Sequence, residues 1–321
     1  MTAPVMASHA AHVPSAAPLW LRLAPTLFLV LWSGGFVVGK IGVQYAEPFT
    51  LLTVRYLLVF AVLVPVFLAM RPSLPRRLSE WGHLCAVGLM LQAGYFCFCY
   101  AAFAAGASAG TVALIVSLQP FAVALLAPAL VGEGRITATR WLGLALGLSG
   151  AALVIFAKSG VELTSLLGVM LVVGAFLSLA GGTLWEKRFG VAHHPVTANT
   201  IQYAVGLAVT LPLTLALEDM RIEWTGELIA ALAYLVLANS LLAVTLLLAM
   251  VRRGEASRVS ALFFLVPAVS ALMAFVLLDE TLPPLGWLGM VVAALGVALA
   301  SQKQPQGASE TDLIRQEEKL R

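Results

Sequence analysis

The chain has 321 residues, of which 60% are hydrophobic and only 11% are charged. An average soluble domain is about one quarter charged, so this composition excludes a water-soluble fold. The formal net charge of +3 is too small to favour a nucleic-acid partner. The composition therefore predicts an all-α integral membrane protein that faces lipid over most of its surface.

Breaks made of charged residues, glycine and proline divide the chain into ten apolar segments, each near the ~20 residues that cross a bilayer. We expect transmembrane helices at residues 24–43, 50–70, 82–104, 109–131, 139–157, 164–185, 196–217, 228–250, 259–278 and 284–301. Residues 1–23 and 302–321 are then cytoplasmic tails. The short loops between the segments leave no room for a folded soluble domain.

The distribution of Lys and Arg predicts the orientation of these segments. If the N-terminus is cytoplasmic, 15 of the 19 basic residues fall on the cytoplasmic side. Only Lys40, Arg55, Lys158 and Arg221 fall on the outer side. Cytoplasmic loops of membrane proteins are enriched in Lys and Arg. We therefore expect a multi-pass protein of the plasma (inner) membrane with both termini in the cytoplasm, which requires an even number of spans.

The chain resembles itself at an offset of 147 residues. The matching pairs include Gly34 with Gly181, Gly35 with Gly182, Lys40 with Lys187, Pro48 with Pro195, Tyr56 with Tyr203, Pro65 with Pro212, Pro120 with Pro267, and Glu133 with Glu280. Each copy, at residues 24–157 and 164–301, holds five spans, so the second copy must enter the membrane inverted. Inverted repeats are a recurrent plan of secondary transporters, which bind substrate between the repeats near the midplane.

Several short motifs occur in the order found in a known family. They are Leu31-Trp32-Ser33-Gly34-Gly35 with Lys40, Pro48 with Arg55, Gln119-Pro120 with Gly132-Glu133, and Val266-Pro267 with Asp279-Glu280. With this ordered set, residues 24–301 resemble the drug/metabolite transporter superfamily, specifically its EamA-type ten-helix permeases. The resemblance implies export or exchange of small metabolites, such as amino acids, through a central cavity. It does not identify the solute.

Polar and aromatic side chains in the middle of the spans are the candidates for a substrate-binding cavity. In lipid, such side chains either bond to neighbouring helices or face a wet pathway. The candidates are Trp32, Ser33, Arg55, Gln92, Tyr95, Tyr100, Gln119, Gln202, Tyr203, Asn239 and Ser240. Gln92 and Asn239 occupy equivalent positions in the two repeats. As a group, these residues predict a cavity suited to a neutral or zwitterionic solute.

Arg55 differs from the other candidates because a cation inside a span is costly. We expect its side chain to face inward and to pair with a carboxylate or with an anionic group of the substrate. Its equivalent in the second repeat is Gln202, so the shared architecture does not require the charge. Lys40 lies nearer to a helix end, where snorkelling towards water is the alternative to a functional role.

Four charged residues are candidates for gating pairs at the mouths of the cavity. Glu133 and Glu280 end their spans, where a negative charge opposes the helix dipole. We expect the pairs Lys40–Glu280 on the outer side and Lys187–Glu133 on the inner side. Screening of the two acids by water is the alternative.

Pro65, Pro120, Pro212 and Pro267 lie within spans, where proline removes a backbone hydrogen bond, and they predict kinks at equivalent places in the two repeats. We expect no metal and no cofactor. The three cysteines, Cys85, Cys97 and Cys99, lie in one apolar stretch without the spacing of metal ligands.

These features predict a transporter that exports small polar metabolites, or facilitates their diffusion, by alternating access. No carboxylate lies at mid-depth of a span, which favours a facilitator, or coupling through a carboxylate at a helix end. The alternative is a membrane-embedded enzyme acting on a lipid-linked or amphiphilic substrate, which would need a catalytic cluster at one membrane face. The short loops offer neither such a cluster nor a receptor domain. As partners we expect a small-molecule substrate and the lipid bilayer, no nucleic acid, and a monomer or homodimer.

Overall fold

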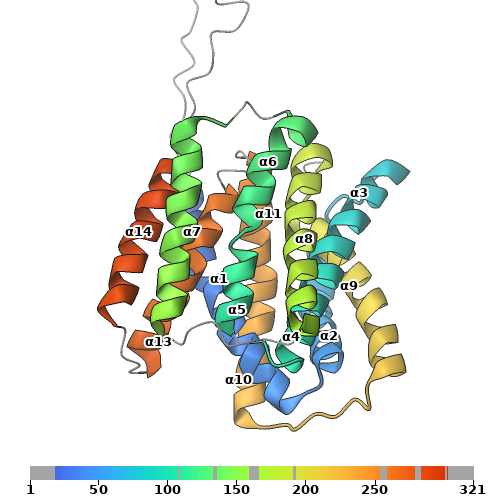
Figure 1. Ribbon diagram of the computed structural model, residues 1–321. Coiled ribbons are helices and arrows are strands. Elements are labelled where there is room, and N and C mark those ends of the chain that lie inside the picture. Colours follow the sequence, from blue (N-terminus) through green and yellow to red (C-terminus); the bar gives the residue numbers. More distant parts are fainter. Residues whose placement is uncertain are drawn as a thin grey trace, which may run out of the picture.

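The computed structural model describes residues 19–107, 109–132, 136–158, 166–190, 193–253, 259–278, 283–300 and 302. In these residues the chain is almost entirely helical, and the helices stand side by side in one bundle (Figure 1). Most residues of the two expected tails lie outside the described residues, as do Glu133 and Glu280.

The helices follow the same order in the two halves of the chain. The first half contains α1 (Leu19–Tyr45), α2 (Pro48–Met70), α3 (Leu78–Gly88) continued by the π-helical segment η1 (Leu89–Tyr95) and α4 (Phe96–Ala104), α5 (Ala109–Val116) followed by α6 (Gln119–Val131), and α7 (Ala138–Lys158). The second half contains α8 (Leu166–Phe189), α9 (Pro195–Leu217), α10 (Gly226–Tyr234) continued by the π-helical segment η2 (Leu235–Ala243) and α11 (Val244–Arg253), the 3₁₀-helix η3 (Ala261–Leu265) followed by α13 (Val266–Leu278), and α14 (Pro284–Ala300).

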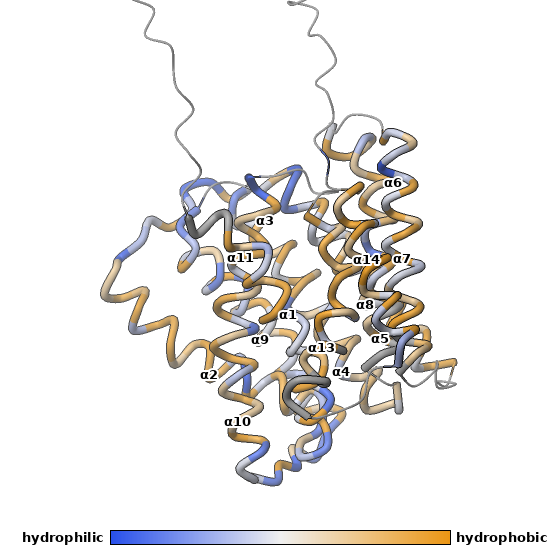
Figure 2. Tube along the Cα trace, turned by 90° about the vertical axis from the view of Figure 1, so that its left-hand side faces the viewer, coloured by the Kyte–Doolittle hydropathy of each residue, from blue (hydrophilic) through white to orange (hydrophobic). Residues whose placement is uncertain are grey.

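The lengths and surfaces of these helices fit a bilayer. Among the described residues, six helices are long and apolar enough to cross a membrane, and four shorter apolar helices complete the ten predicted spans. Large apolar side chains such as Leu57, Leu125 and Leu215 are exposed on the outside of the bundle. Hydrophobic residues dominate the middle of the bundle, and hydrophilic residues gather towards its two ends (Figure 2). Such exposed apolar surface is stable in lipid and not in water. The expected ten-helix membrane fold is confirmed.

Equivalent helices of the two halves make equivalent contacts. α2 packs against α9, and α7 packs against α14. α1 packs against α10 and η2, and its equivalent α8 packs against η1 and α4. Figure 1 shows α7 and α14 side by side at one edge of the bundle. These contacts have the pattern of a pseudo-two-fold axis that passes through the α2–α9 and α7–α14 contacts.

Equivalent spans are also irregular at equivalent places. The third and eighth spans contain the π-helical segments η1 and η2. The fourth span turns directly before Gln119-Pro120, and the ninth span is 3₁₀-helical up to the residue before Val266-Pro267. By contrast, α2 and α9 continue as α-helices through Pro65 and Pro212. Two of the four prolines thus coincide with a change in helix type, and the other two lie in uninterrupted α-helix.

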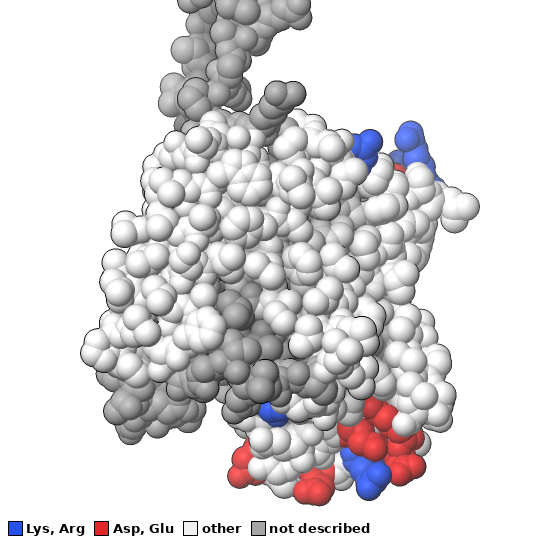
Figure 3. All heavy atoms as spheres, viewed as in Figure 1, with Lys and Arg blue, Asp and Glu red and all other residues white. Residues whose placement is uncertain are grey.

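The two ends of the bundle differ in charge. In Figure 3, acidic side chains gather at the lower edge and basic side chains at the upper edge. At the acidic end, the Glu218 carboxylate accepts hydrogen bonds from the backbone N–H groups of Phe49 (2.8 Å) and Thr50 (2.6 Å). The first turn of a helix has unpaired N–H groups and favours a negative charge, so Glu218 caps α2 from the end of α9. We call this end, at which Lys40 lies, the Lys40 end, and the opposite end the Glu186 end.

Candidate functional site

Arg55 lies two turns into α2 and is completely buried. Its Nε donates to the Ser240 hydroxyl (2.8 Å), its Nη1 to the Tyr100 hydroxyl (3.2 Å), and its Nη2 to Oδ1 of Asn239 (2.8 Å). The guanidinium carbon also lies 4.3 Å from the centre of the Phe96 ring. A cation over an aromatic face is attracted by the ring quadrupole. Neutral groups from α4 and η2 therefore hold the charge in place.

Two equivalent tyrosines meet next to Arg55, where α2 contacts α9. The rings of Tyr56 and Tyr203 lie 5.4 Å apart at 62°, which is an edge-to-face contact. The Tyr56 hydroxyl donates to the backbone carbonyl of Gln92 in η1 (2.5 Å), and the Tyr203 hydroxyl donates to the carbonyl of Ser240 in η2 (2.8 Å). Each tyrosine thus binds the π-helical segment of its own half. These irregular segments have backbone carbonyls available to side chains, as π-bulges at functional sites often do.

Gln92 and Gln202 lie on the other side of the same contact, at the positions equivalent to Asn239 and Arg55. Both side chains are completely buried, and neither amide makes a hydrogen bond of ordinary geometry to a protein group. Gly206 makes room for Gln92, since a Cβ on Gly206 would lie 2.8 Å from the Cβ of Gln92. A buried polar group without a partner costs about 1–3 kcal/mol. Two such amides side by side mark a place where a ligand or another conformation supplies the partners.

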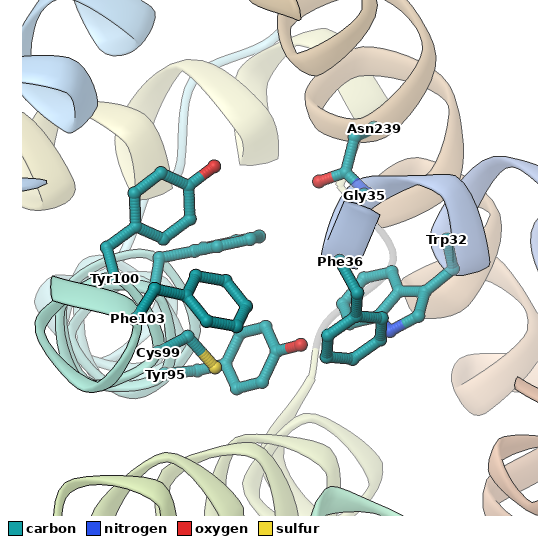
Figure 4. Close-up of a pocket in the computed structure, with 9 residues that line it drawn as sticks. Trp32, Gly35, Phe36, Tyr95, Cys99, Tyr100, Phe103 and Asn239 are labelled. Carbon is teal, nitrogen blue, oxygen red and sulfur yellow. The ribbon is translucent and has the colours of Figure 1, made fainter. Parts of the chain in front are cut away.

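A small cavity lies against the Arg55 cluster, enclosed by α1, η1 and α4 of the first half and bounded on one side by Asn239 of the second half. It is lined by Trp32, Gly35, Phe36, Tyr95, Phe96, Cys99, Tyr100, Phe103 and Asn239. Its volume of about 20 Å³ suffices for about one water molecule. In Figure 4, Tyr100 and Asn239 stand on facing walls with their oxygen atoms turned towards the same space. Because Tyr100, Asn239 and Phe96 all contact Arg55, the guanidinium lies directly behind the wall.

Trp32 forms the apolar side of this cavity. Its ring stacks on Tyr95 at 5.7 Å and 21°, and contacts Phe263 edge to face at 5.6 Å. Its Nε1–H is buried and has no hydrogen-bond partner in the protein. The cavity therefore combines aromatic faces with a few unused polar atoms, as small-molecule sites commonly do.

Two predicted site residues lie outside the lining of this cavity. The Gln119 Nε2 donates to Thr183 (3.2 Å) and to Ser260 (3.1 Å), so Gln119 joins the fourth, sixth and ninth spans. Ser33 is buried with its hydroxyl unpaired, and its carbonyl accepts a hydrogen bond from Ser270 (3.1 Å). Of the other predicted residues, Trp32, Tyr95, Tyr100 and Asn239 line the cavity, whereas Arg55, Gln92, Gln202, Tyr203 and Ser240 lie at the α2–α9 contact behind it.

Lys40 closes the Lys40 end of the cavity. Its Nζ donates to the backbone carbonyls of Phe103, in the last turn of α4, and of Ala107, just beyond that helix, each at 3.1 Å. Carbonyls at a helix C-terminus are unpaired and favour a positive charge. Lys40 therefore turns inward to the protein instead of snorkelling to water. The expected pair Lys40–Glu280 stays a prediction, because Glu280 lies outside the described residues.

An ion pair joins two spans at the opposite end of the bundle. Arg252, at the end of α11, donates through Nε to Glu186, whose side chain is completely buried in the last turns of α8. Nearby, Nη1 of Arg188 donates to the backbone carbonyl of Leu130 near the end of α6. Lys187 lies in the same turn of α8, but its expected partner Glu133 lies outside the described residues, so that pair stays a prediction.

Several functional residues were not among the predicted site residues. Phe96, Cys99 and Phe103 line the cavity and, with the predicted Tyr100, follow Gln92 at intervals of three and four residues. This spacing places all of them on one face of a helix. Glu186 was missed because its equivalent in the first half is Gly39, so the internal repeat does not single it out. In the described part of the chain, no group of three or more His, Cys, Asp or Glu is placed to hold a metal ion.

Comparison with known proteins agrees with the paired architecture. The sequence model of the EamA-like transporter family matches this chain twice, over residues 20–156 and again over residues 166–302. The chain belongs to the EamA-like transporter family. A solved structure, described only as a crystal structure of a protein, superposes with a TM-score of 0.73 at 20% sequence identity, covering 89% of this chain and 97% of its own. At that identity the likeness shows the fold alone.

The named relatives of this EamA-like protein are transporters. It is 29% identical over 282 residues to a probable amino-acid metabolite efflux pump of Salmonella typhimurium, which covers 84% of this chain and 91% of the relative. A protein of the same description from Escherichia coli is 26% identical over 84% of this chain and 91% of its own. The uncharacterized transporter YvbV of Bacillus subtilis is 26% identical over 86% of this chain and 89% of its own. The chain is thus a multi-pass membrane protein of a transporter family.

Proposed function

We propose that this protein is a non-enzymatic transporter of the plasma (inner) membrane that exports small polar metabolites, such as amino acids, or facilitates their diffusion. The observation that carries the proposal is the cavity where Asn239 of the second half meets α1 and α4 of the first half. It has aromatic walls and unused polar atoms, and charged contacts lie towards both ends of the bundle. Secondary transporters with inverted repeats bind substrate in this position. Two relatives are described as probable amino-acid metabolite efflux pumps, which supports the same substrate class.

The contacts at the two ends support alternating access as the mechanism. At the Lys40 end, the end of the first span is joined to the end of the third. At the Glu186 end, the sixth span is joined to the eighth, which are the equivalent spans of the second half. Breaking one closure while keeping the other opens the cavity to one side of the membrane. The basic Glu186 end would face the cytoplasm, together with both termini, since cytoplasmic segments are enriched in Lys and Arg.

Counterflow in proteoliposomes tests this proposal. Vesicles containing the purified protein are loaded with one unlabelled solute from a panel of amino acids and other small metabolites, and uptake of the same labelled solute is followed. We expect at least one solute to accumulate transiently, and we expect accumulation to persist with a protonophore if the protein is a facilitator. Loss of accumulation with the protonophore would instead assign proton coupling. If no solute of the panel exceeds protein-free vesicles, the proposed function is wrong.

A further inference from the structure

Arg55 is a buried cation without a counter-ion. No carboxylate of the described residues pairs with it, and all three of its hydrogen-bond acceptors are neutral. A charge within the membrane region is costly unless it is paired or serves a pathway. The equivalent position carries Gln202, and α9 still packs against α2 there, so the fold does not need the charge. Both facts indicate that the charge is kept for a ligand.

The guanidinium is oriented as a receptor for a carboxylate. Its two terminal nitrogens are bound to Tyr100 and Asn239, which both line the cavity. Each of its three nitrogens donates one N–H to a neutral acceptor, and the two terminal nitrogens are the ones whose acceptors line the cavity. The face of Phe96 sets the plane of the group. Two parallel N–H donors in a plane match the two oxygens of a carboxylate. The Tyr100 hydroxyl, at 3.2 Å, holds the longest of the three bonds and is the acceptor most easily exchanged.

The rest of the cavity wall favours an apolar or aromatic ligand body, for which this cavity of about 20 Å³ has to widen. Six of its nine lining residues are aromatic: Trp32, Phe36, Tyr95, Phe96, Tyr100 and Phe103. None of the nine is acidic, so the described wall offers no ion-pair partner to an ammonium group. The charge balance of the site is therefore positive, and it differs from that expected for a zwitterionic solute.

We propose that the substrate is an organic monocarboxylate with an apolar or aromatic body, that Arg55 binds its carboxylate in place of Tyr100 and Asn239, and that an α-amino group is not required. This rests on the proposed transport function and narrows its substrate class. The neutral acceptors around Arg55 occupy the carboxylate position while the cavity is closed and empty. A charged acceptor forms hydrogen bonds about twice as strong as theirs, so the ligand displaces them.

Ligand-induced thermal stabilisation of the purified protein tests the inference without requiring transport. The probes are 3-phenylpropionate, 4-methylpentanoate, phenylalanine, phenethylamine and 3-phenylpropanol at pH 7. A ligand that binds only the folded state raises the melting temperature by an amount that grows with the logarithm of its concentration divided by its Kd. We expect the three carboxylates to bind, 3-phenylpropionate at least as tightly as phenylalanine, and the amine and the alcohol to bind at least about tenfold more weakly.

Three variants locate the effect. In Arg55→Gln, which copies the residue at position 202, carboxylate affinity should fall at least about tenfold, the loss of a charge-assisted hydrogen bond. Arg55→Lys keeps the positive charge but loses the planar pair of donors. Its carboxylate affinity should lie between those of Arg55→Gln and the wild type. The matched control is Arg221→Gln, which removes an exposed cation from a loop and should bind like the wild type. If Arg55→Gln does not fold, the binding of the five probes to the wild type still tests whether the site requires a carboxylate.

Three outcomes would overturn the inference: equal binding of the amine or the alcohol, no binding of any of the acids, or unchanged carboxylate affinity in Arg55→Gln. Phenylalanine binding more than tenfold tighter than 3-phenylpropionate would overturn the statement on the amino group. Counterflow separates these results from the proposed function. If the protein transports an amine or a sugar but not the acids, the proposed function stands and the inference about the carboxylate is wrong. If the acids bind but no solute is transported, the carboxylate site stands and the proposed function is wrong.

Discussion

Two helix pairs meet at the pseudo-two-fold axis of this protein, one through glycines and the other through aromatic and polar side chains. The α7–α14 pair meets through glycines, with Cβ positions on Gly150 and Gly296 only 2.2 Å from backbone nitrogens of the opposite helix. The α2–α9 pair meets through Tyr56 and Tyr203 and carries Arg55, Gln92 and Gln202 close to the contact. Both pairs join the same two halves of the chain, so the difference between them is not required by the symmetry.

This difference indicates that the α7–α14 pair holds the two halves together, whereas the α2–α9 pair moves or binds substrate. In lipid, close backbone packing at small residues is sufficient to associate helices. The α7–α14 pair uses this device together with one hydrogen bond, from Nε of Arg140 in α7 to the carbonyl of Ala300 in α14 (2.9 Å), and its described residues hold no buried amide without a partner. At the α2–α9 pair, by contrast, Gln202 of α9 and Gln92 of the adjoining η1 keep buried amides without partners, which is costly in a static contact. We therefore assign rigidity to the first pair and substrate binding to the second, and this assignment makes three predictions.

The largest effect on stability is expected at the α7–α14 pair. In Gly150→Leu, the new side chain would meet the backbone of Ala293 and Gly289, so the two helices must separate. Overpacking of this kind costs about 1–3 kcal/mol. We expect the melting temperature of the purified protein in detergent to fall by roughly 5 °C, since 1 kcal/mol corresponds to about 2–4 °C in larger domains.

Gly82→Ala is the control for this variant. Gly82 lies in α3 with nothing within 4 Å of its Cβ position. Alanine is a better helix former than glycine by up to about 1 kcal/mol, so the melting temperature should stay the same or rise. If Gly150→Leu is tolerated as well as Gly82→Ala, the α7–α14 pair is not the rigid part of the molecule.

A smaller effect, of opposite sign, is expected at the α2–α9 pair. In Gln202→Leu, a buried amide without a partner is replaced by an apolar side chain of similar length. Removing the unpaired group should stabilise the protein by about 1 kcal/mol. If the amide binds substrate, the counterflow rate should fall about tenfold, which is the loss of about one hydrogen bond. Increased stability with decreased transport is the combination that a structural role does not produce.

Gln119→Leu is the matched comparison, because the same substitution there removes two hydrogen bonds, to Thr183 and Ser260. We expect Gln119→Leu to lose about 1 kcal/mol where Gln202→Leu gains it. A loss of stability in both variants would mean that Gln202 has protein partners in the membrane and contributes to the fold.

The two helix pairs also differ in how far the sequence predicts them. Arg55, Gln92, Gln202 and Asn239 are polar residues in apolar segments, so a one-dimensional pattern identifies them and the internal repeat relates them. In the sequence, the glycines of α7 reduce the hydrophobicity and include the spacing Gly143-x-x-x-Gly147, which predicts a close helix approach but not the helix that approaches. That the glycines of α7 and α14 face each other is a property of the packing, which no local pattern specifies.

Apolar residues of the cavity could not be separated from those that face lipid. Phe96 and Phe103 lie in the wall, whereas Phe98, in the same helix, is exposed on the outside. In a soluble protein, burial alone would distinguish them, but here both surfaces favour the same side chains. The ion pair of Glu186 with Arg252 was hidden for a related reason, since its partners are 66 residues apart on different spans.

The smallest effect is expected where the cavity closes, and it tests whether the α2–α9 side opens while α7 and α14 stay together. In Lys40→Met, the closure at the Lys40 end loses its two hydrogen bonds to the carbonyls of Phe103 and Ala107. A cation at a helix C-terminus contributes about 0.3–1 kcal/mol, so the population open at that end should rise about twofold to fivefold.

Cys99 lines the cavity and reports this opening through its reaction with a membrane-impermeant maleimide, in a Cys85→Ser, Cys97→Ala background. Labelling from the outside of cells should accelerate by the same factor. Arg252→Met breaks the closure at the opposite end and should not accelerate it. Equal acceleration in both variants would show that the two closures do not act separately, and the Lys40 end would then be a structural contact like the α7–α14 pair.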